Sequence, residues 1–238
     1  MQDRFINFIR ENNLTTPDDS ILLGVSGGID SMVMLQLFLK SGFKIAVAHC
    51  NFGLRADESD GDEQFVKYYC LMNGIVCHSI KFDTNEYAAE NKLSIQVAAR
   101  ELRYAYFEEI CKEYKYTKVA IAHNLNDTAE TVLINLCRGT GIKGVAGIKV
   151  MNGNIIRPLL FATRIEIEDF AKSHDVKYRE DSSNSTTKYK RNFIRHKIIP
   201  ELRYLNPSVD RAIADTANHL QEAVWLVEEQ LGRIREVV

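Results

Sequence analysis

The sequence predicts an α/β protein with a doubly wound, mainly parallel sheet and a C-terminal helical extension. Three observations lead to this fold class. Short apolar runs alternate along the chain with longer segments of helical periodicity. Several of these runs are apolar at nearly every position, as in parallel strands that are covered on both faces. The last segment, residues 209–238, is one long helical pattern.

The predicted strands are short and are separated by helices. Strands are expected at residues 21–25, 44–49, 75–82, 119–122 and 154–157. Helices are expected at residues 30–40, in a segment ending near 73–74, and at 94–114, 127–137, 163–174 and 209–238. Ser94 is the expected N-cap of one helix, and Thr163 with Glu166 forms a capping box for another.

Composition narrows the class of protein. With 238 residues, 45% hydrophobic and 26% charged, the chain suits one large globular domain with an appendage. No apolar run approaches the roughly 18 residues of a membrane span, and the N-terminus is too polar for a signal peptide, so we expect a cytoplasmic protein with no membrane partner. The five cysteines are scattered without a C-x-x-C pair, which indicates reduced thiols.

A glycine pair directly after the first predicted strand indicates a phosphate-binding loop. The loop consists of Ser26, Gly27, Gly28, Ile29, Asp30 and Ser31. Two glycines allow a sharp turn, and the following helix directs free N–H groups and its positive dipole end at the same place. Hydroxyls can donate to phosphate oxygens, and Asp30 can serve a Mg²⁺ ion that bridges them. The loop lacks the lysine of the Walker motif and the spacing of the dinucleotide-binding motif.

These loop residues resemble the signature S-G-G-x-D-S of the N-type ATP pyrophosphatases, the PP-loop family, at all five fixed positions. The resemblance implies a Rossmann-like fold of the adenine nucleotide alpha hydrolase type. It also implies that ATP is split between the α and β phosphates, so that pyrophosphate leaves and a carbonyl oxygen is adenylated. A nitrogen or sulfur nucleophile then displaces AMP.

Further elements, in the same order, resemble the tRNA(Ile)-lysidine synthetases within that family. They lie at residues 49–55, 99–104, 123–131, 157–160, 180–184 and 191–195. Two positions depart from the pattern: Phe52 replaces a second histidine, and Asn126 replaces the first of two aspartates. Asp127 alone must then carry any metal or base role of that aspartate pair.

The resemblance implies ligation of L-lysine to the first anticodon cytidine of a minor isoleucine tRNA with a CAU anticodon. ATP and Mg²⁺ are the implied cofactors, and lysidine, AMP and pyrophosphate are the products. The attacking amine must be neutral, so a base or a depressed lysine pKa is needed. We expect Asp127 to bind or deprotonate the incoming lysine.

The resemblance also assigns roles to individual side chains. The expected catalytic residues are Asp30, Arg100, His123, Asp127 and Glu130, with Asp30 and Asp127 as metal ligands. His49 is expected to contact adenine or ribose. The expected substrate-binding residues are Asn51, Arg55, Arg103, Arg191 and Arg195. The basic segment at residues 186–205 is expected to meet tRNA phosphates.

We expect a PP-loop domain at residues 1–205 and a helical linker at 206–238 that leads to a further domain. A homodimer is compatible with the sequence. Three alternatives stay open: a tRNA thiolase, which should carry paired cysteines, an amidating enzyme similar to NAD synthetase, and a non-catalytic nucleotide-binding module.

Overall fold

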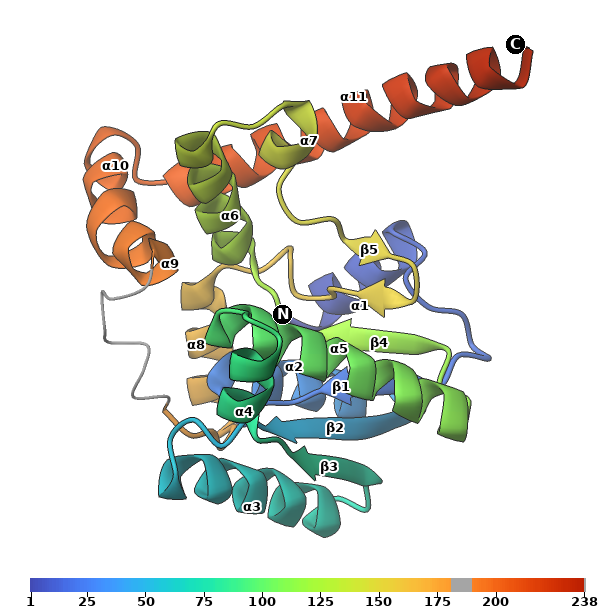
Figure 1. The fold of residues 1–238 in the computed structure, drawn as a ribbon, viewed down its shortest axis with the longest axis vertical. Coiled ribbons are helices and arrows are strands. Elements are labelled where there is room, and N and C mark those ends of the chain that lie inside the picture. The colour runs from blue at the N-terminus through green and yellow to red at the C-terminus, as the bar shows by residue number, and fades with distance from the viewer. Residues whose placement is uncertain (181–189, 238) are drawn as a thin grey trace. The chain divides into compact units, whose positions relative to one another are not determined.

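The computed structural model describes residues 1–180 and 190–237 (Figure 1). The chain divides into two compact units. The first comprises residues 1–122, 151–158 and 165–180, and the second comprises residues 123–150, 159–164 and those from 181 onward. The domain limits expected from sequence, at residues 205 and 206, remain a prediction.

The first unit contains one six-stranded sheet. Its strands are β1 (Ile21–Gly24), β2 (Ile45–Asn51), β3 (Cys77–Lys81), β4 (Lys118–Ile121), β5 (Met151–Asn152) and β6 (Ile155–Ile156). Their order is β3-β2-β1-β4-β6-β5, and every neighbouring pair is parallel except β5 with β6 (Figure 1). The doubly wound, mainly parallel sheet predicted from the sequence is therefore confirmed.

Helices flank this sheet in the first unit. They are α1 (Gln2–Glu11), α2 (Ile29–Lys40), α3 (Asp57–Met72), α4 (Thr84–Glu90), α5 (Ile95–Tyr114) and α8 (Arg164–Ser173). As predicted, Ser94 caps α5, because its side chain accepts a hydrogen bond from the backbone N–H of Val97.

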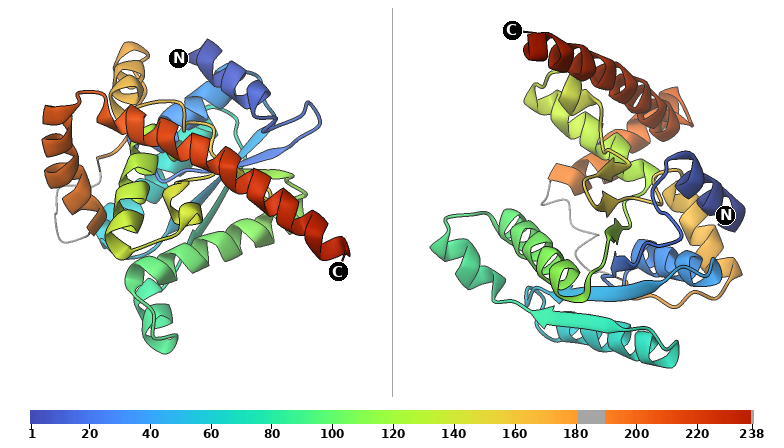
Figure 2. Two further views of the ribbon diagram at one scale, coloured as in Figure 1. Left: turned by 90° about the horizontal axis from the view of Figure 1, so that it is seen from above. Right: turned by 90° about the vertical axis from the view of Figure 1, so that its right-hand side faces the viewer.

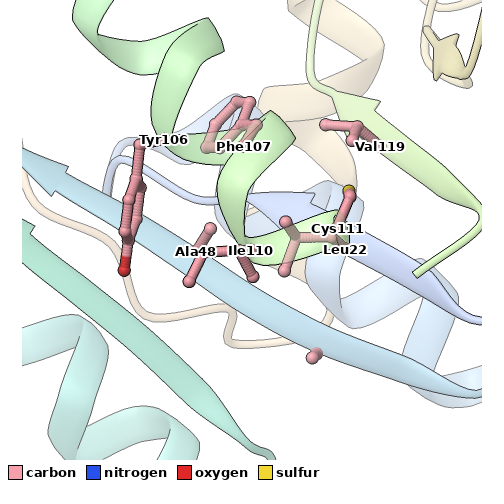
Figure 3. Close-up of a cluster of buried hydrophobic side chains, with 8 residues drawn as sticks. Leu22, Ala48, Tyr106, Phe107, Ile110, Cys111 and Val119 are labelled. Atoms are coloured by element: carbon pink, nitrogen blue, oxygen red, sulfur yellow. The ribbon is translucent and has the colours of Figure 1, made fainter. Parts of the chain in front are cut away.

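The helix α5 packs on one face of the sheet through apolar side chains (Figure 3). Tyr106, Phe107 and Ile110 of the helix meet Leu22 of β1 and other buried strand residues in one cluster. At Gly24, an added Cβ would lie 2.8 Å from the Phe107 ring, so the end of β1 accepts no larger residue without repacking. Burial of apolar area, at about 25 cal/mol per Å², holds the helix on the strands.

The strand order places the phosphate loop at a ligand-binding position. The chain passes from β1 outward to β2 and β3, and then returns to the other side of β1 with β4. In open α/β sheets, ligands bind beyond the carboxyl ends of the strands where the order reverses in this way. Residues 26–31 follow one residue after the end of β1 and so occupy this position.

The second unit is helical. Its elements are α6 (Leu125–Arg138), α7 (Ile142–Val145), α9 (Lys190–Phe193), the π-helical turn η2 (Ile194–Ile198), α10 (Ile199–Leu205) and α11 (Val209–Val237). The long helix α11 lies against α6 and α7 (Figure 2). The amide of Gln221 on α11 donates to the carbonyls of Ala146 (2.7 Å) and Ile148 (3.1 Å), which fixes the loop after α7.

Several elements differ from the sequence predictions. The sequence patterns did not predict α1, α4 and α7; α4 and α7 have only 7 and 4 residues, too few to show helical periodicity. α6 begins at Leu125, two residues before the predicted start, because Asn124 caps it. β2 continues to Asn51. Among the described helices, none combines the length and apolar character needed to cross a membrane.

Candidate functional site

The loop between β1 and α2 is held together from within by Ser31. This side chain is 5% exposed; its Oγ accepts a hydrogen bond from the Ser26 N–H (3.2 Å) and donates to the Gly28 carbonyl (2.8 Å). Gly27 has a φ of +92°, in the region that favours glycine, and Gly28 is the N-cap of α2. Ser26 is exposed, so it is available to a ligand, whereas Ser31 shapes the loop.

The next two loop residues point in different directions. Ile29 is buried in the core, and Asp30 is half-buried in the first turn of α2. The described residues contain no group of three or more His, Cys, Asp or Glu side chains that could hold a metal by themselves. Mg²⁺ commonly binds one or two carboxylates together with substrate phosphates and water, and the position of Asp30 fits that mode.

Two residues at the end of β2 that are predicted to contact ligands, His49 and Asn51, make hydrogen bonds inside the first unit. His49 is 2% exposed, and its Nδ1 donates to the Val25 carbonyl (2.9 Å). Burial lowers the pKa of His49, so the ring is neutral at pH 7 with Nε2 as its acceptor. Asn51 is also 2% exposed; its amide donates to Asp60 (2.8 Å) and Glu63 (2.9 Å) of α3.

Arg55 is held by α3. Its guanidinium donates to Asp62 Oδ2 over 2.7 Å and lies 3.6 Å from Glu58. Asp62 is 9% exposed. The predicted substrate-binding role of Arg55 therefore competes with an ion pair on its own unit.

Phe52, which departs from the family pattern, supports a half-buried arginine. The guanidinium of Arg103 lies 5.2 Å from the centroid of the Phe52 ring, which stacks on Phe82 with a centroid distance of 5.9 Å. Burial lowers the pKa of Arg103. A cation over an aromatic face is stabilised by about 0.5–2 kcal/mol. An aromatic ring at position 52 thus orients Arg103.

Arg100 and Arg103 lie three residues apart on α5, which corresponds to the helix predicted at residues 94–114. Arg100 is exposed, and its guanidinium lies 4.8 Å from the centroid of the Tyr104 ring. Arg157, 7% exposed, has its pKa lowered by burial and raised by interaction with Tyr104. Arg100, Arg103 and Arg157 thus give the first unit a positive region centred on Tyr104, suited to an anionic ligand.

In the second unit, the predicted residues Glu130, Arg191 and Arg195 form one ion-pair cluster. Glu130 is fully buried, and its carboxylate accepts from Arg191 Nε (2.8 Å) and from Arg195 Nε (2.5 Å) and a second nitrogen (3.1 Å). Burial raises the pKa of Glu130, and hydrogen bonding by Arg195 opposes that shift. The cluster joins α6 to α9 and η2. Glu130 is therefore an anchor for two arginines.

Asp127 belongs to the same cluster but is bound less tightly. Its Oδ2 accepts from the backbone N–H of Asn124 (3.0 Å), completing a capping box at the start of α6. Its Oδ1 lies 3.4 Å from Arg195 and 3.9 Å from Arg191. These longer distances leave Oδ1 able to accept a further hydrogen bond. Two guanidinium groups this close disfavour a further cation, and the metal role expected for Asp127 remains a prediction.

Asn126, the second departure from the family pattern, has a structural role. Its amide nitrogen donates to Asp210 Oδ1 (2.6 Å), and its amide oxygen accepts from the Arg164 N–H (2.8 Å). Asp210 is 6% exposed and also receives a hydrogen bond from Arg203 (2.7 Å). Position 126 must therefore donate and accept at once, as an amide does and a carboxylate does not.

The basic segment predicted at residues 186–205 is partly engaged within the second unit. Residues 186–189, like most of the element at 180–184, lie outside the described part of the chain. Arg191, Arg195 and Arg203 all pair with carboxylates. Lys190 and Lys197 are exposed and can meet phosphates. His123 is half-buried, two residues after β4 ends.

Sequence reasoning missed Asp62 and Arg179 beside the phosphate loop. The Nε of Arg179 donates to Asp62 Oδ1 over 2.6 Å, and its backbone N–H donates to the Gly27 carbonyl over 3.0 Å. The one sequence signal was Gly61 inside a helix, since glycine there is unfavourable by about 1 kcal/mol and calls for a reason.

Comparisons with known proteins agree with these motifs. Residues 1–202 match the model of the PP-loop domain family. A curated tRNA(Ile)-lysidine synthase from Bacteroides thetaiotaomicron is 43% identical over 235 residues, which cover 99% of this chain and 55% of that protein. Another, from Chlorobaculum tepidum, is 44% identical over 94% of this chain and 70% of that protein. The chain spans about half the length of most of these relatives.

Solved structures share the fold at low identity. The U34-tRNA thiolase NcsA from Methanococcus maripaludis, solved with its 4Fe-4S cluster, gives a TM-score of 0.75 at 21% identity, covering 93% of this chain and 78% of that chain. An NH3-dependent NAD synthetase from Campylobacter jejuni gives a TM-score of 0.53 at 15% identity, over 94% of this chain and 93% of that chain. At these identities the likeness shows the fold alone.

Proposed function

Because the chain belongs to the tRNA(Ile)-lysidine synthase family of PP-loop proteins, we propose that it is a ligase that joins L-lysine to the first anticodon cytidine of a tRNA(Ile) with a CAU anticodon. ATP is consumed, and lysidine, AMP and pyrophosphate are formed. The observation that carries the proposal is the phosphate loop at residues 26–31, which stands where the strand order reverses. A cytoplasmic location follows from a tRNA substrate.

In the first step, the ring carbonyl oxygen of cytidine attacks the α-phosphorus of ATP, and the bond from that phosphorus to the β-phosphate oxygen breaks. Negative charge builds on the departing pyrophosphate. We assign the donors for that charge to the N–H groups at the start of α2 and to the exposed Ser26 hydroxyl, whose oxygen accepts from the Gly28 N–H over 3.3 Å. Asp30 would hold Mg²⁺, which neutralises phosphate charge when bound.

In the second step, the neutral ε-amine of lysine attacks the activated ring carbon, and AMP leaves with the oxygen. Lysine arrives as an ammonium ion, so it must lose a proton before attack. We assign the contact with this amine to Oδ1 of Asp127, because its neighbours lie at 3.4 and 3.9 Å. Glu130, saturated by two arginines, positions Arg191 and Arg195.

Two groups of cations support binding of RNA phosphates. In the first unit, Arg100 is exposed and stacks on Tyr104. In the second, Lys190 and Lys197 are exposed on α9 and η2. Affinity for tRNA should then fall as salt rises, because phosphate contacts release counterions.

The decisive experiment is mass spectrometry of tRNA after incubation of the protein with ATP, Mg²⁺ and lysine. The expected product is tRNA heavier by one lysine less one water, at the first anticodon position. Reactions without lysine or without ATP are the controls. If the tRNA is unchanged but AMP is released when deamido-NAD is supplied, the amidating alternative is favoured. If a sulfur-containing cytidine forms when a sulfur donor is supplied, the thiolase is favoured. Unchanged tRNA and no AMP release with any acceptor would leave a nucleotide-binding module.

A further inference from the structure

A segment distant in sequence reaches the phosphate loop of the first unit. The backbone N–H of Arg179 donates to the carbonyl of Gly27 over 3.0 Å. The Arg179 side chain is fixed at a second point, where its Nε donates to Asp62 Oδ1 over 2.6 Å. Asp62 is 9% exposed, and its other oxygen binds Arg55. The segment at residues 178–180 is thus tied both to the loop and to α3.

The helix α3 provides room for this arginine. A Cβ added at Gly61 would lie 3.0 Å from a terminal nitrogen of Arg179 and 3.4 Å from the guanidinium carbon. A larger residue at position 61 would therefore press on the guanidinium, which would have to shift by a few tenths of an ångström. Gly61 is accommodated inside α3 because the Arg179 side chain packs against the helix at that position.

The contact with Gly27 determines where the next peptide N–H points. In a trans peptide the carbonyl and the following N–H point in opposite directions. Holding the Gly27 carbonyl on Arg179 therefore directs the Gly28 N–H to the opposite side, where it donates a hydrogen bond to the exposed Ser26 Oγ over 3.3 Å. The peptide that joins Gly27 and Gly28 can rotate more freely than most, because Gly27 is a glycine with a φ of +92°. A hydrogen bond from another segment of the chain is therefore needed to fix its orientation.

We propose that Arg179 is a positioning residue of the phosphate loop, which holds the Gly28 N–H, and through it the Ser26 hydroxyl, in place for the leaving pyrophosphate of ATP. The inference rests on the proposed function, because that function identifies the ligand of the loop. Arg179 itself does not touch the reacting atoms. Its anchor on Asp62 keeps the backbone of residues 178–180 in place, and this backbone in turn holds the Gly27 carbonyl.

The test is steady-state kinetics of lysidine formation by Arg179→Met. This variant loses the anchor but keeps a long side chain, and Asp62 keeps Arg55 as its partner. We expect the KM for ATP and the inhibition constant of pyrophosphate to rise about tenfold, the effect of one weakened hydrogen bond to a charged group. The KM for lysine should stay unchanged. Arg179→Lys, which keeps the charge, should recover part of the change.

A matched control is Lys177→Met, which removes a positive charge two residues away from a surface pair with Asp175 (2.7 Å). It should match the wild type in every constant. A merely structural role of Arg179 would reduce the folded fraction, lowering the apparent kcat without changing either KM. Gly61→Ala gives a second test that improves helix propensity while crowding the guanidinium, and the KM for ATP should rise there too.

The outcomes separate the two proposals. If the wild type forms no lysidine, the proposed function fails. If the wild type is active and both Arg179→Met and Gly61→Ala keep the wild-type KM for ATP and inhibition by pyrophosphate, the positioning role is wrong. A rise in the KM for ATP in Arg179→Met, absent in Lys177→Met, supports it.

Discussion

The substitution Asn126→Asp, which introduces the residue usual in the family, should destabilise this protein. It removes the hydrogen bond from the amide to Asp210 (2.6 Å) and sets two carboxylates against each other where Asp210 is 6% exposed. Two unit charges about 4 Å apart repel by about 4 kcal/mol at an effective dielectric constant near 20. Arg203, 2.7 Å from Asp210, offsets part of this.

We therefore expect a loss of about 2.5 kcal/mol in the free energy of unfolding at pH 8. The corresponding fall in Tm is about 5–10 °C. The deficit should shrink toward pH 5. Binding a proton to either carboxyl relieves this repulsion only in the folded state, so the folded form of the variant binds more protons than its unfolded form, and its stability relative to the wild type falls as pH rises.

The assay is urea unfolding of the wild type, Asn126→Asp, Asp210→Asn and the double variant at pH 5 and pH 8. In the double variant the carboxylate and amide exchange places, so one hydrogen bond between the two positions can form again, and the coupling energy should be at least 1 kcal/mol. Equal urea midpoints for the wild type and Asn126→Asp at pH 8 would refute the reasoning. So would a double variant no more stable than Asn126→Asp.

Four further changes test other parts of the two units. Glu130→Gln should lower the free energy of unfolding by about 2 kcal/mol in urea titrations, because a neutral amide replaces the fully buried carboxylate that pairs with two arginines. An unchanged urea midpoint would contradict the anchor role. Asp127→Asn should retain ATP:pyrophosphate exchange in the presence of tRNA while lysidine formation fails, and persistence of both would show that the lysine role is wrong. His49→Gln should flatten the fall in stability between pH 7 and pH 5, because burial depresses the pKa of His49 and the unfolded chain then binds the extra proton; an unaltered slope would assign the fall to other groups. Phe52→Leu should cost about 1 kcal/mol more stability than Phe52→Tyr, since only the ring attracts Arg103; equal costs would count against the cation–π contact.

The sequence alone predicted the sheet and the phosphate loop, because both depend on local order along the chain. An apolar run identifies a buried strand wherever it lies, and glycines after it identify a tight turn. The strand order confirmed the doubly wound sheet. The helices α4 and α7 were missed because 7 and 4 residues carry too little periodicity.

The roles of charged side chains were harder to predict. From the sequence, Arg191 and Arg195 were expected to bind substrate, and Asp127 and Glu130 were expected to be catalytic. Only the folded second unit shows that Glu130 and both arginines form one cluster. The sequence around a charged residue does not reveal its ion-pair partner when the partner is as far away as Glu130 is from Arg191, 61 residues along the chain.

Tertiary structure also decided what the two unusual positions do. In the sequence, Phe52 and Asn126 were departures whose consequence was open. Folding brings Phe52 beneath Arg103 and Asn126 against Asp210, 84 residues away. The element order, the phosphate loop and the family resemblance could be predicted from the sequence, since these are properties of neighbouring residues. Which side chains pair, and how Arg179 holds the loop, required the fold, because ion pairs and hydrogen bonds depend on distances that only packing sets.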